Sequence, residues 1–137
     1  MNIDAKDLIL GRLAAYAAKQ ALLGSQINIV NCDKAAITGS KENISQKYKE
    51  RRARGTPFKG PFFPRVSERI VKRAVKGMLP HKQERGKKAL KRVKCYFGIP
   101  EALNEQKFET IQRMNILNSR TPKFIYVGDL AKLLGRK

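Results

Sequence analysis

The sequence has no tryptophan, one histidine and two cysteines among 137 residues, and this scarcity excludes several kinds of site. Cys32 and Cys95 form no CxxC pair, and with His81 they make no cluster of metal ligands. We therefore predict no metal site. We expect both cysteines to be small buried apolar residues, with a disulfide or a metal role as the alternatives.

Long apolar runs are also missing. No stretch approaches the roughly 18 residues that a membrane-spanning helix needs. The N-terminal segment MNIDAKDLIL carries Asp4 and Asp7 where a signal peptide would be basic. We therefore expect a soluble, intracellular protein with reduced cysteines and no membrane partner.

Motifs that bind nucleotides or carry catalysis are absent as well. The glycines form neither GxxxxGK[ST] nor a GxGxxG after residues 27–32. The eleven acidic residues are scattered, so paired acid–base groups are not indicated. Asp4 and Asp7 are interpreted as turn and helix-start residues, and His81 as a backbone or RNA contact. The sequence predicts no enzymatic activity, no cofactor and no small-molecule substrate.

Positive charge is what the sequence has in excess. Thirty lysines and arginines face eleven acidic residues, which gives a net charge of +19 and a pI near 10.4. The excess lies in residues 41–94, with nineteen basic and four acidic residues, whereas residues 1–40 are nearly neutral. Such a charge opposes compaction unless a polyanion neutralises it. The pattern is typical of a nucleic-acid-binding protein.

The segment KYKERRAR, residues 47–54, concentrates this charge. A charge run is often a solvated helix face. Here, like charges at helical spacing would repel one another without a counterion, which favours binding to a polyanion. Arg51, Arg52 and Arg54 can donate to phosphates in a bidentate way.

Three phenylalanines interleave with cations in the following segment FKGPFFPR, residues 58–65. Aromatic rings can stack on unpaired RNA bases. We expect instead that Phe58, Phe62 and Phe63 pack beneath the loop as a small secondary core. The helix predicted over 67–79 has an apolar face that could suit a membrane surface, but we expect this face to pack in the core.

Hydrophobic periodicity and turn residues predict one α/β domain over residues 1–137. The predicted strands are 2–5, 27–32, 94–97, 108–112 and 123–127, and the predicted helices are 10–23, 41–53, 67–79, 84–93 and 129–135. Strand, helix and strand in succession over 2–32 indicate parallel pairing. We interpret 37–40 as a turn, 54–65 as a loop and 101–122 as ambiguous, and 41–94 as a basic insertion.

Individual residues carry some of these element predictions. We expect the first helix to bury one face through Leu10, Leu13, Ala14, Ala17, Ala21 and Leu22. Ser40 and Ser67 are predicted to cap the two helices that follow them. The helix over 41–53 has only Ile44 and Tyr48 as an apolar stripe. We expect residues 41–65 to be mobile in the free protein, because they combine few apolar anchors with strong self-repulsion.

Three segments in order resemble the universal large-subunit ribosomal protein family numbered thirteen. They are LGRLAAYAAKQALLG, INIVNCDKAAITGSK and VKGMLPHKQERGKKALKRVKCYFGIP, and the resemblance covers roughly residues 1–100. The chain lacks the N-terminal extension of bacterial members and the helical tail of eukaryotic ones, so the type it resembles is archaeal. The resemblance implies a three-layer α/β/α fold on a small, mostly parallel, mixed sheet of about four strands.

The resemblance also implies a role. It implies a cytoplasmic ribosomal protein that binds large-subunit ribosomal RNA, contacts neighbouring large-subunit proteins and assists assembly, without catalysis or a cofactor. The family's interaction surface maps onto the basic middle and onto 77–86, where Gly77 and Gly86 would allow close approach to RNA or tight turns. Without the resemblance, the residues indicate only a basic α/β nucleic-acid binder. An RNA-modifying enzyme or a DNA-compacting protein are the alternatives.

The predicted RNA contacts are basic side chains of the middle segment, which would neutralise phosphates where RNA helices meet. The primary set is Arg51, Arg52, Arg54, Lys59, Arg65, Lys82, Arg85, Lys87, Lys88 and Arg92. A secondary set is Lys72, Arg73 and Lys76.

Overall fold

The computed structural model describes residues 1–136, and it confirms the α/β class. The strands are β1 (Asn2–Asp4), β2 (Ile27–Val30), β3 (Ala36–Thr38), β4 (Val93–Cys95) and β5 (Phe124–Tyr126). The α-helices are α1 (Leu10–Leu22), α2 (Lys41–Ala53), α3 (Ser67–Met78), α4 (Glu84–Arg92) and α5 (Val127–Leu133). Four short 3-10 helices are η1 (Cys32–Lys34), η2 (Glu101–Leu103), η3 (Gln112–Met114) and η4 (Ile116–Asn118). All five predicted helices are present, with ends within two residues of those predicted.

Three strands form a parallel sheet in the order β1-β2-β4, so the predicted parallel pairing is confirmed. Its register aligns Ile3, Ile29 and Cys95 in one row. The neighbouring row is Asn2, Asn28 and Lys94. Because side chains alternate along a strand, the first row faces the core and the second faces away from it.

The strand predicted at 108–112 is reduced to a single parallel bridge beside β1. There Glu109 N–H donates to the Asn2 carbonyl at 2.8 Å, and Asp4 N–H donates to the Glu109 carbonyl at 3.1 Å. The chain from β4 to this bridge returns from one edge of the sheet to the other. It contains η2 with the buried Leu103, and Gln106 accepts a hydrogen bond from the Asn2 side chain. The resemblance implies two outer layers around the sheet. The second of these is thin, because it consists of the 3-10 helix η2 and irregular chain.

A second, two-stranded sheet corrects the prediction for 37–40. Strand β3 pairs antiparallel with β5, with Ile37 opposite Ile125, so the chain turns only after Thr38. The turn occurs at Gly39, whose φ of +128° suits glycine. The predicted single mixed sheet is thus divided into a parallel sheet and an antiparallel pair. The partner of Ile37 lies far along the chain, so the local sequence signal could not reveal it.

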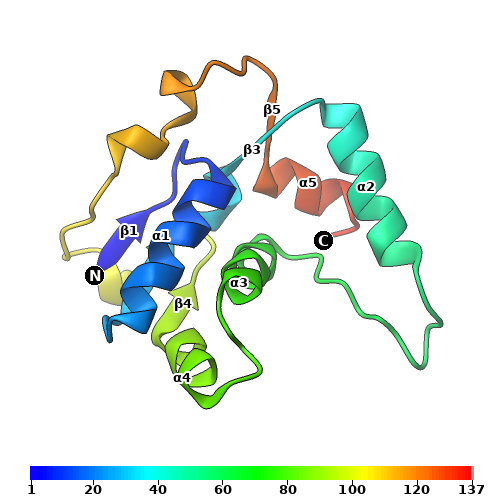
Figure 1. Ribbon diagram of the computed structural model, residues 1–137. Helices are drawn as coiled ribbons and strands as arrows, with labels where there is room; N and C mark the ends of the chain where they lie inside the picture. The colour runs from blue at the N-terminus through cyan, green and yellow to red at the C-terminus, as the bar shows by residue number, and fades with distance from the viewer. Residues whose placement is uncertain (137) are drawn as a thin grey trace.

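The core lies between the parallel sheet and the helices α1, α3 and α4 (Figure 1). Alanines on α1 let this helix pack closely against α3, whose buried residues include Val71 and Val75. One prediction on α1 is wrong, because Leu22 is 44% exposed and Ala18 is buried in its place. Helix α2 and the segment 54–66 lie at the periphery, away from β1, β2 and β4 (Figure 1).

The two cysteines are free. Cys32 is buried, as predicted, whereas Cys95 is only half-buried. Hydrogen bonding with Cys95, together with burial, raises the pKa of the Cys32 thiol far above its usual value, so this thiol stays protonated. None of the helices described for residues 1–136 is long and apolar enough to span a bilayer.

Candidate nucleic-acid interface

Ten of the thirteen predicted contact residues are exposed, and Arg52, Lys72 and Arg92 are half-buried. They form two groups. The α2–loop group comprises Arg51, Arg52, Arg54, Lys59 and Arg65. The α3–α4 group comprises Lys72, Arg73, Lys76, Lys82, Arg85, Lys87, Lys88 and Arg92.

These cations have almost no acidic partners in the protein itself. Within residues 1–136, the one contact below 4.0 Å between a basic and an acidic side chain joins Lys88 to Glu84 at 2.9 Å, and both side chains are largely exposed. No acidic residue occurs between Arg51 and Val66. The positive surface is therefore left to an external partner, and the exposed Lys88–Glu84 pair contributes little stability.

Helix α2 is held by few contacts. Ile44 is buried and Tyr48 is half-buried, which matches the predicted apolar stripe. Ser40 occupies the N-cap position but makes no side-chain capping hydrogen bond. At the other end, Arg52 donates from Nη1 to the carbonyl of Leu134 after α5. Arg52 therefore fastens α2 to α5, and only its remaining N–H groups are available for a ligand.

The loop after α2 is anchored through one aromatic ring. Phe63 packs edge-on against Tyr48 with 5.5 Å between ring centroids. The guanidinium of Arg73 on α3 lies 4.6 Å from the centroid of the Phe63 ring, a cation–π contact. The prediction that all three phenylalanines pack beneath the loop is wrong for two of them, because Phe58 is 94% exposed and Phe62 is 70% exposed.

A tight turn shapes the tip of this loop. Thr56 and Gly60 exchange backbone hydrogen bonds of 3.2 and 3.0 Å, and the Thr56 hydroxyl accepts from Lys59 N–H at 3.1 Å. Gly55 has a φ of +85°, and a Cβ there would lie 1.9 Å from the Gly60 carbonyl oxygen. Gly55 and Thr56 are therefore positioning residues that sequence reasoning missed, although the Gly-Thr-Pro order signals a turn.

The second basic group extends along α3, the turn that follows it and α4. A Cβ at Gly86 would lie 2.1 Å from the Pro80 carbonyl oxygen, so this glycine serves the tight packing of α4 on the turn. Gly77, by contrast, has open space around it. His81 contacts the Leu79 carbonyl at 3.3 Å, in line with its interpretation as a backbone contact. Arg92 donates to the Ala21 carbonyl at 3.0 Å, so it too has a structural partner.

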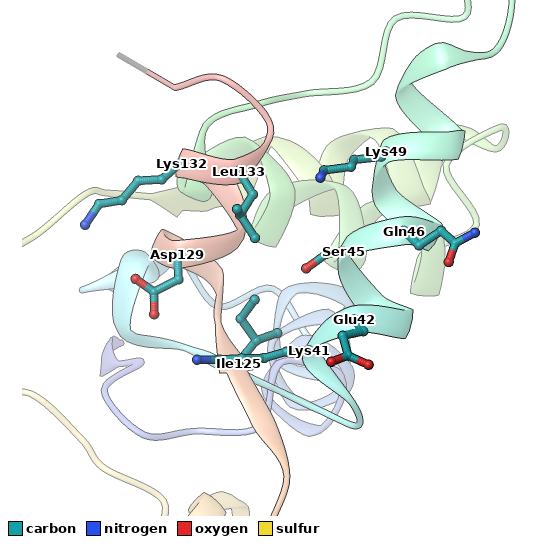
Figure 2. Close-up of a pocket in the computed structure, with 9 residues that line it drawn as sticks. All are labelled: Lys41, Glu42, Ser45, Gln46, Lys49, Ile125, Asp129, Lys132 and Leu133. Atoms are coloured by element: carbon teal, nitrogen blue, oxygen red, sulfur yellow. The ribbon is translucent and has the colours of Figure 1, made fainter.

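A groove of about 760 Å³ runs between α2 and α5. Figure 2 shows Ser45 and Lys49 of α2 pointing toward α5, and Leu133 pointing back toward α2. The lining is of mixed charge, since Glu42 and Asp129 belong to it as well as lysines. A polyanion would meet repulsion from these carboxylates, so the groove itself suits RNA less well than the α2–loop group does.

Across residues 1–136, the His, Cys, Asp and Glu side chains form no cluster of three or more that could hold a metal ion. The two basic groups can act on a partner through charge and shape, by means of exposed Lys and Arg on the α/β frame.

Residues 1–102 match the family model described as Ribosomal protein L13. The chain is 44% identical over 134 residues to the large ribosomal subunit protein uL13 of Archaeoglobus fulgidus, which covers 97% of this chain and 86% of that relative. It is 42% identical over 135 residues to the protein of the same name from Methanococcoides burtonii. This match covers 98% of this chain and 97% of that relative.

A third relative has the same name and comes from Methanosarcina barkeri, with 43% identity over 136 residues, 98% of this chain and 97% of the relative. These relatives are archaeal, so the predicted resemblance is confirmed in both family and type. The match extends through the C-terminal third of the chain, where the three segments gave no guidance. The chain belongs to the ribosomal protein L13 family.

Proposed function

We propose that this protein is a structural constituent of the large ribosomal subunit in the cytoplasm, where it binds large-subunit ribosomal RNA and contacts neighbouring ribosomal proteins. Family membership supports the setting. One observation supports the RNA-binding surface above all others. Of the thirteen basic residues predicted to bind RNA, ten are exposed, and a single salt bridge joins basic to acidic side chains within residues 1–136.

The proposed mechanism is scaffolding. Lys and Arg of the two basic groups neutralise phosphates where RNA segments approach each other, which lowers the repulsion between those segments. The α/β frame fixes the backbone that carries α3 and α4, so little conformational entropy is lost from that group on docking. Binding of this kind stabilises one fold of the RNA and thereby assists subunit assembly.

The residues differ in what they contribute to this surface. Arg54, Lys59 and Arg65 are exposed and make no hydrogen bond from their charged ends within the described chain, so we assign them direct phosphate contacts. Arg52 and Arg92 each donate to a carbonyl at a helix end. We assign these two a mainly structural role, with phosphate contacts through their free N–H groups as a secondary one.

The salt dependence of RNA binding tests the proposal. The affinity of the purified protein for fragments of large-subunit ribosomal RNA is measured from 50 to 200 mM salt. If six to ten phosphates are engaged, the affinity falls roughly 10³- to 10⁵-fold over that range. A slope near zero rejects the proposal. Equal affinity for duplex DNA of the same length would instead favour a general nucleic-acid binder.

Cosedimentation tests the ribosomal setting separately. A cell lysate is run through a high-salt sucrose gradient, and the protein is followed by mass spectrometry. We expect it to travel in equal amount with the large subunit. Recovery at the top of the gradient, or with DNA, would contradict the assignment.

A further inference from the structure

A concavity of about 790 Å³ lies where the end of α2, the 54–66 loop and α5 meet. Its charged lining residues are all basic, namely Lys49, Arg52, Arg54 and Arg65. Its aromatic lining residues are Phe62 and Phe63. The volume is within the roughly 300–1,000 Å³ that is usual for pockets that hold small ligands.

The lining combines cations with an aromatic wall. Phe62 is 70% exposed, and one side of its ring lies against Gly60. A Cβ at Gly60 would approach that ring to 3.1 Å, and the φ of +79° at Gly60 is one that glycine adopts easily. Gly60 thus lies beside one edge of the ring, at Cδ2 and Cε2, and the high exposure of Phe62 leaves ring surface available to a ligand.

The concavity is also held in place at both ends. Arg52 joins α2 to the carbonyl of Leu134, which fixes the wall that α5 provides. Phe63 is held between Tyr48 and Arg73, which fixes the base of the loop. These contacts would restrict the motion expected of residues 41–65 in the free protein and so lower the entropy lost on binding.

We propose that this concavity binds one unpaired RNA nucleotide, with the base stacked on Phe62 and the adjoining phosphates held by Arg54, Arg65 and Lys49. The proposal rests on the proposed function and names the kind of RNA feature that this part of the surface takes. A base inside a duplex has both faces covered by its neighbours, whereas a looped-out base can stack on an aromatic ring. Four cations without a carboxylate match the phosphates on either side of such a nucleotide.

The adjoining α2–α5 groove marks the limit of this site. It shares Lys49 and Leu133 with the concavity, but its lining also includes Glu42 and Asp129. These carboxylates repel a continuing phosphate chain. The site therefore suits a single looped-out nucleotide better than a long single strand lying across both hollows.

Two hairpin RNAs test the proposal. They are identical except that one has a single bulged 2-aminopurine nucleotide and the other is fully paired. Affinity is measured by fluorescence anisotropy, and stacking by the emission of the 2-aminopurine. Wild-type protein should bind the bulged hairpin roughly 5- to 150-fold more tightly, the range expected for one base stacked on an aromatic side chain, and should quench its emission.

Phe62→Leu should abolish this preference and the quenching, so that the bulged and the paired hairpin bind with equal affinity. Phe58→Leu is the matched control. Phe58 is in the same loop and 94% exposed, but it does not line the concavity, so its replacement should leave the preference intact. Thermal melting of both variants confirms that each is folded. Arg54→Gln should weaken binding of both hairpins, because both present phosphates.

The outcomes separate this proposal from the one on which it rests. Equal wild-type affinity for the two hairpins would overturn the nucleotide site but leave ribosomal RNA binding standing. Loss of the preference in Phe58→Leu rather than in Phe62→Leu would also overturn it. Binding of an acidic peptide in place of either hairpin would assign the concavity to a protein partner. Failure to bind any RNA, ribosomal fragments included, would reject the proposed function itself.

Discussion

Arg92, the last residue of α4, donates a hydrogen bond from Nη1 to the backbone carbonyl of Ala21 in the last turn of α1, at 3.0 Å. The last carbonyls of a helix lie at the negative end of its dipole, and the Ala21 carbonyl also accepts a hydrogen bond from Gly24 N–H at 3.2 Å. A half-buried guanidinium therefore stabilises this end by both hydrogen bonding and charge. Two arginines predicted as RNA contacts, Arg92 and Arg52, thus connect separate helices of the fold.

Replacement of Arg92 tests this structural role. Arg92→Met should lower the free energy of unfolding by about 1–2 kcal/mol, because it removes a charge-assisted hydrogen bond and leaves the Ala21 carbonyl without this donor. Lys88→Met is the control, since Lys88 makes only an exposed salt bridge and should change stability by less than about 0.5 kcal/mol. Urea denaturation measures both. Equal losses of unfolding free energy in the two variants would show that the Arg92 hydrogen bond stabilises the fold no more than the exposed salt bridge does.

The exposed cations of the loop should affect binding without affecting stability. In the double variant Arg54→Gln and Lys59→Gln, each replacement removes about one phosphate contact, so the salt slope for ribosomal RNA binding should fall by about two. The midpoint of urea denaturation should stay nearly unchanged, because both side chains are exposed. An unchanged salt slope would show that Arg54 and Lys59 do not contact phosphates.

Two glycines offer a matched test of backbone geometry. Gly55→Ala should destabilise the loop by at least about 1 kcal/mol, because φ is +85° and the new Cβ would meet the Gly60 carbonyl. Gly77→Ala should stabilise α3 by about 0.5–1 kcal/mol, since its Cβ would have open space and alanine favours helix. Thermal unfolding and the loop amide signals in NMR measure the two effects. Similar behaviour of the two variants would contradict this account.

Tyrosine titration provides a pH test. The Tyr126 hydroxyl donates to Asp7 at 2.8 Å, and this hydrogen bond, more than burial, raises the pKa of Tyr126. Desolvation raises the pKa of Tyr48, against the lowering effect of Arg51. A raised pKa favours the protonated form in the folded state, so the stabilisation is present below pH 10 and is lost as the pH rises through the folded-state value.

Absorbance at 295 nm should therefore show late-titrating tyrosines among the four in the chain. Tyr126→Phe should remove one late step, and Tyr48→Phe should remove another. Four tyrosines that titrate together near pH 10 would contradict both assignments.

We propose that residues 1–137 unfold as one unit. Leu130 of α5 is fully buried and belongs to the same core cluster as Ile3 and Val75. Leu130→Ala should therefore lower the free energy of unfolding by about 2–5 kcal/mol and shift the whole transition. Circular dichroism and tyrosine fluorescence should report the same midpoint in urea. Separate loss of α5 at low urea would show that the C-terminal part is an independent unit.

Sequence reasoning succeeded where the signal was local. The five helices follow from apolar periodicity and turn residues, and β1, β2 and their parallel pairing follow from the strand–helix–strand order. It failed where a partner lies far along the chain. Strand β3 depends on Ile125, and the expected strand at 108–112 shortened to one bridge at Glu109.

The candidate site shows the same division. Composition was enough to locate the exposed cations in residues 41–94, but not to show which of them have partners within the protein. Ser67, predicted as an N-cap, is instead buried and accepts a hydrogen bond from Arg136 at 3.2 Å.

The family, confirmed by its relatives, identifies a structural ribosomal protein and not an enzyme, as the missing catalytic motifs predicted.

The pairing of β3 with β5 has a consequence for how the molecule is made. Residues 36–38 leave the ribosome tunnel long before 124–126, and α3 also leaves it before α5. During that interval the N-terminal strands and α1 can associate, but one flank of the core stays open to water. Folding with such distant partners is slow. Each new molecule therefore completes this flank of its core only after β5 and α5 have been synthesised, and until then the apolar residues of the flank are exposed to solvent.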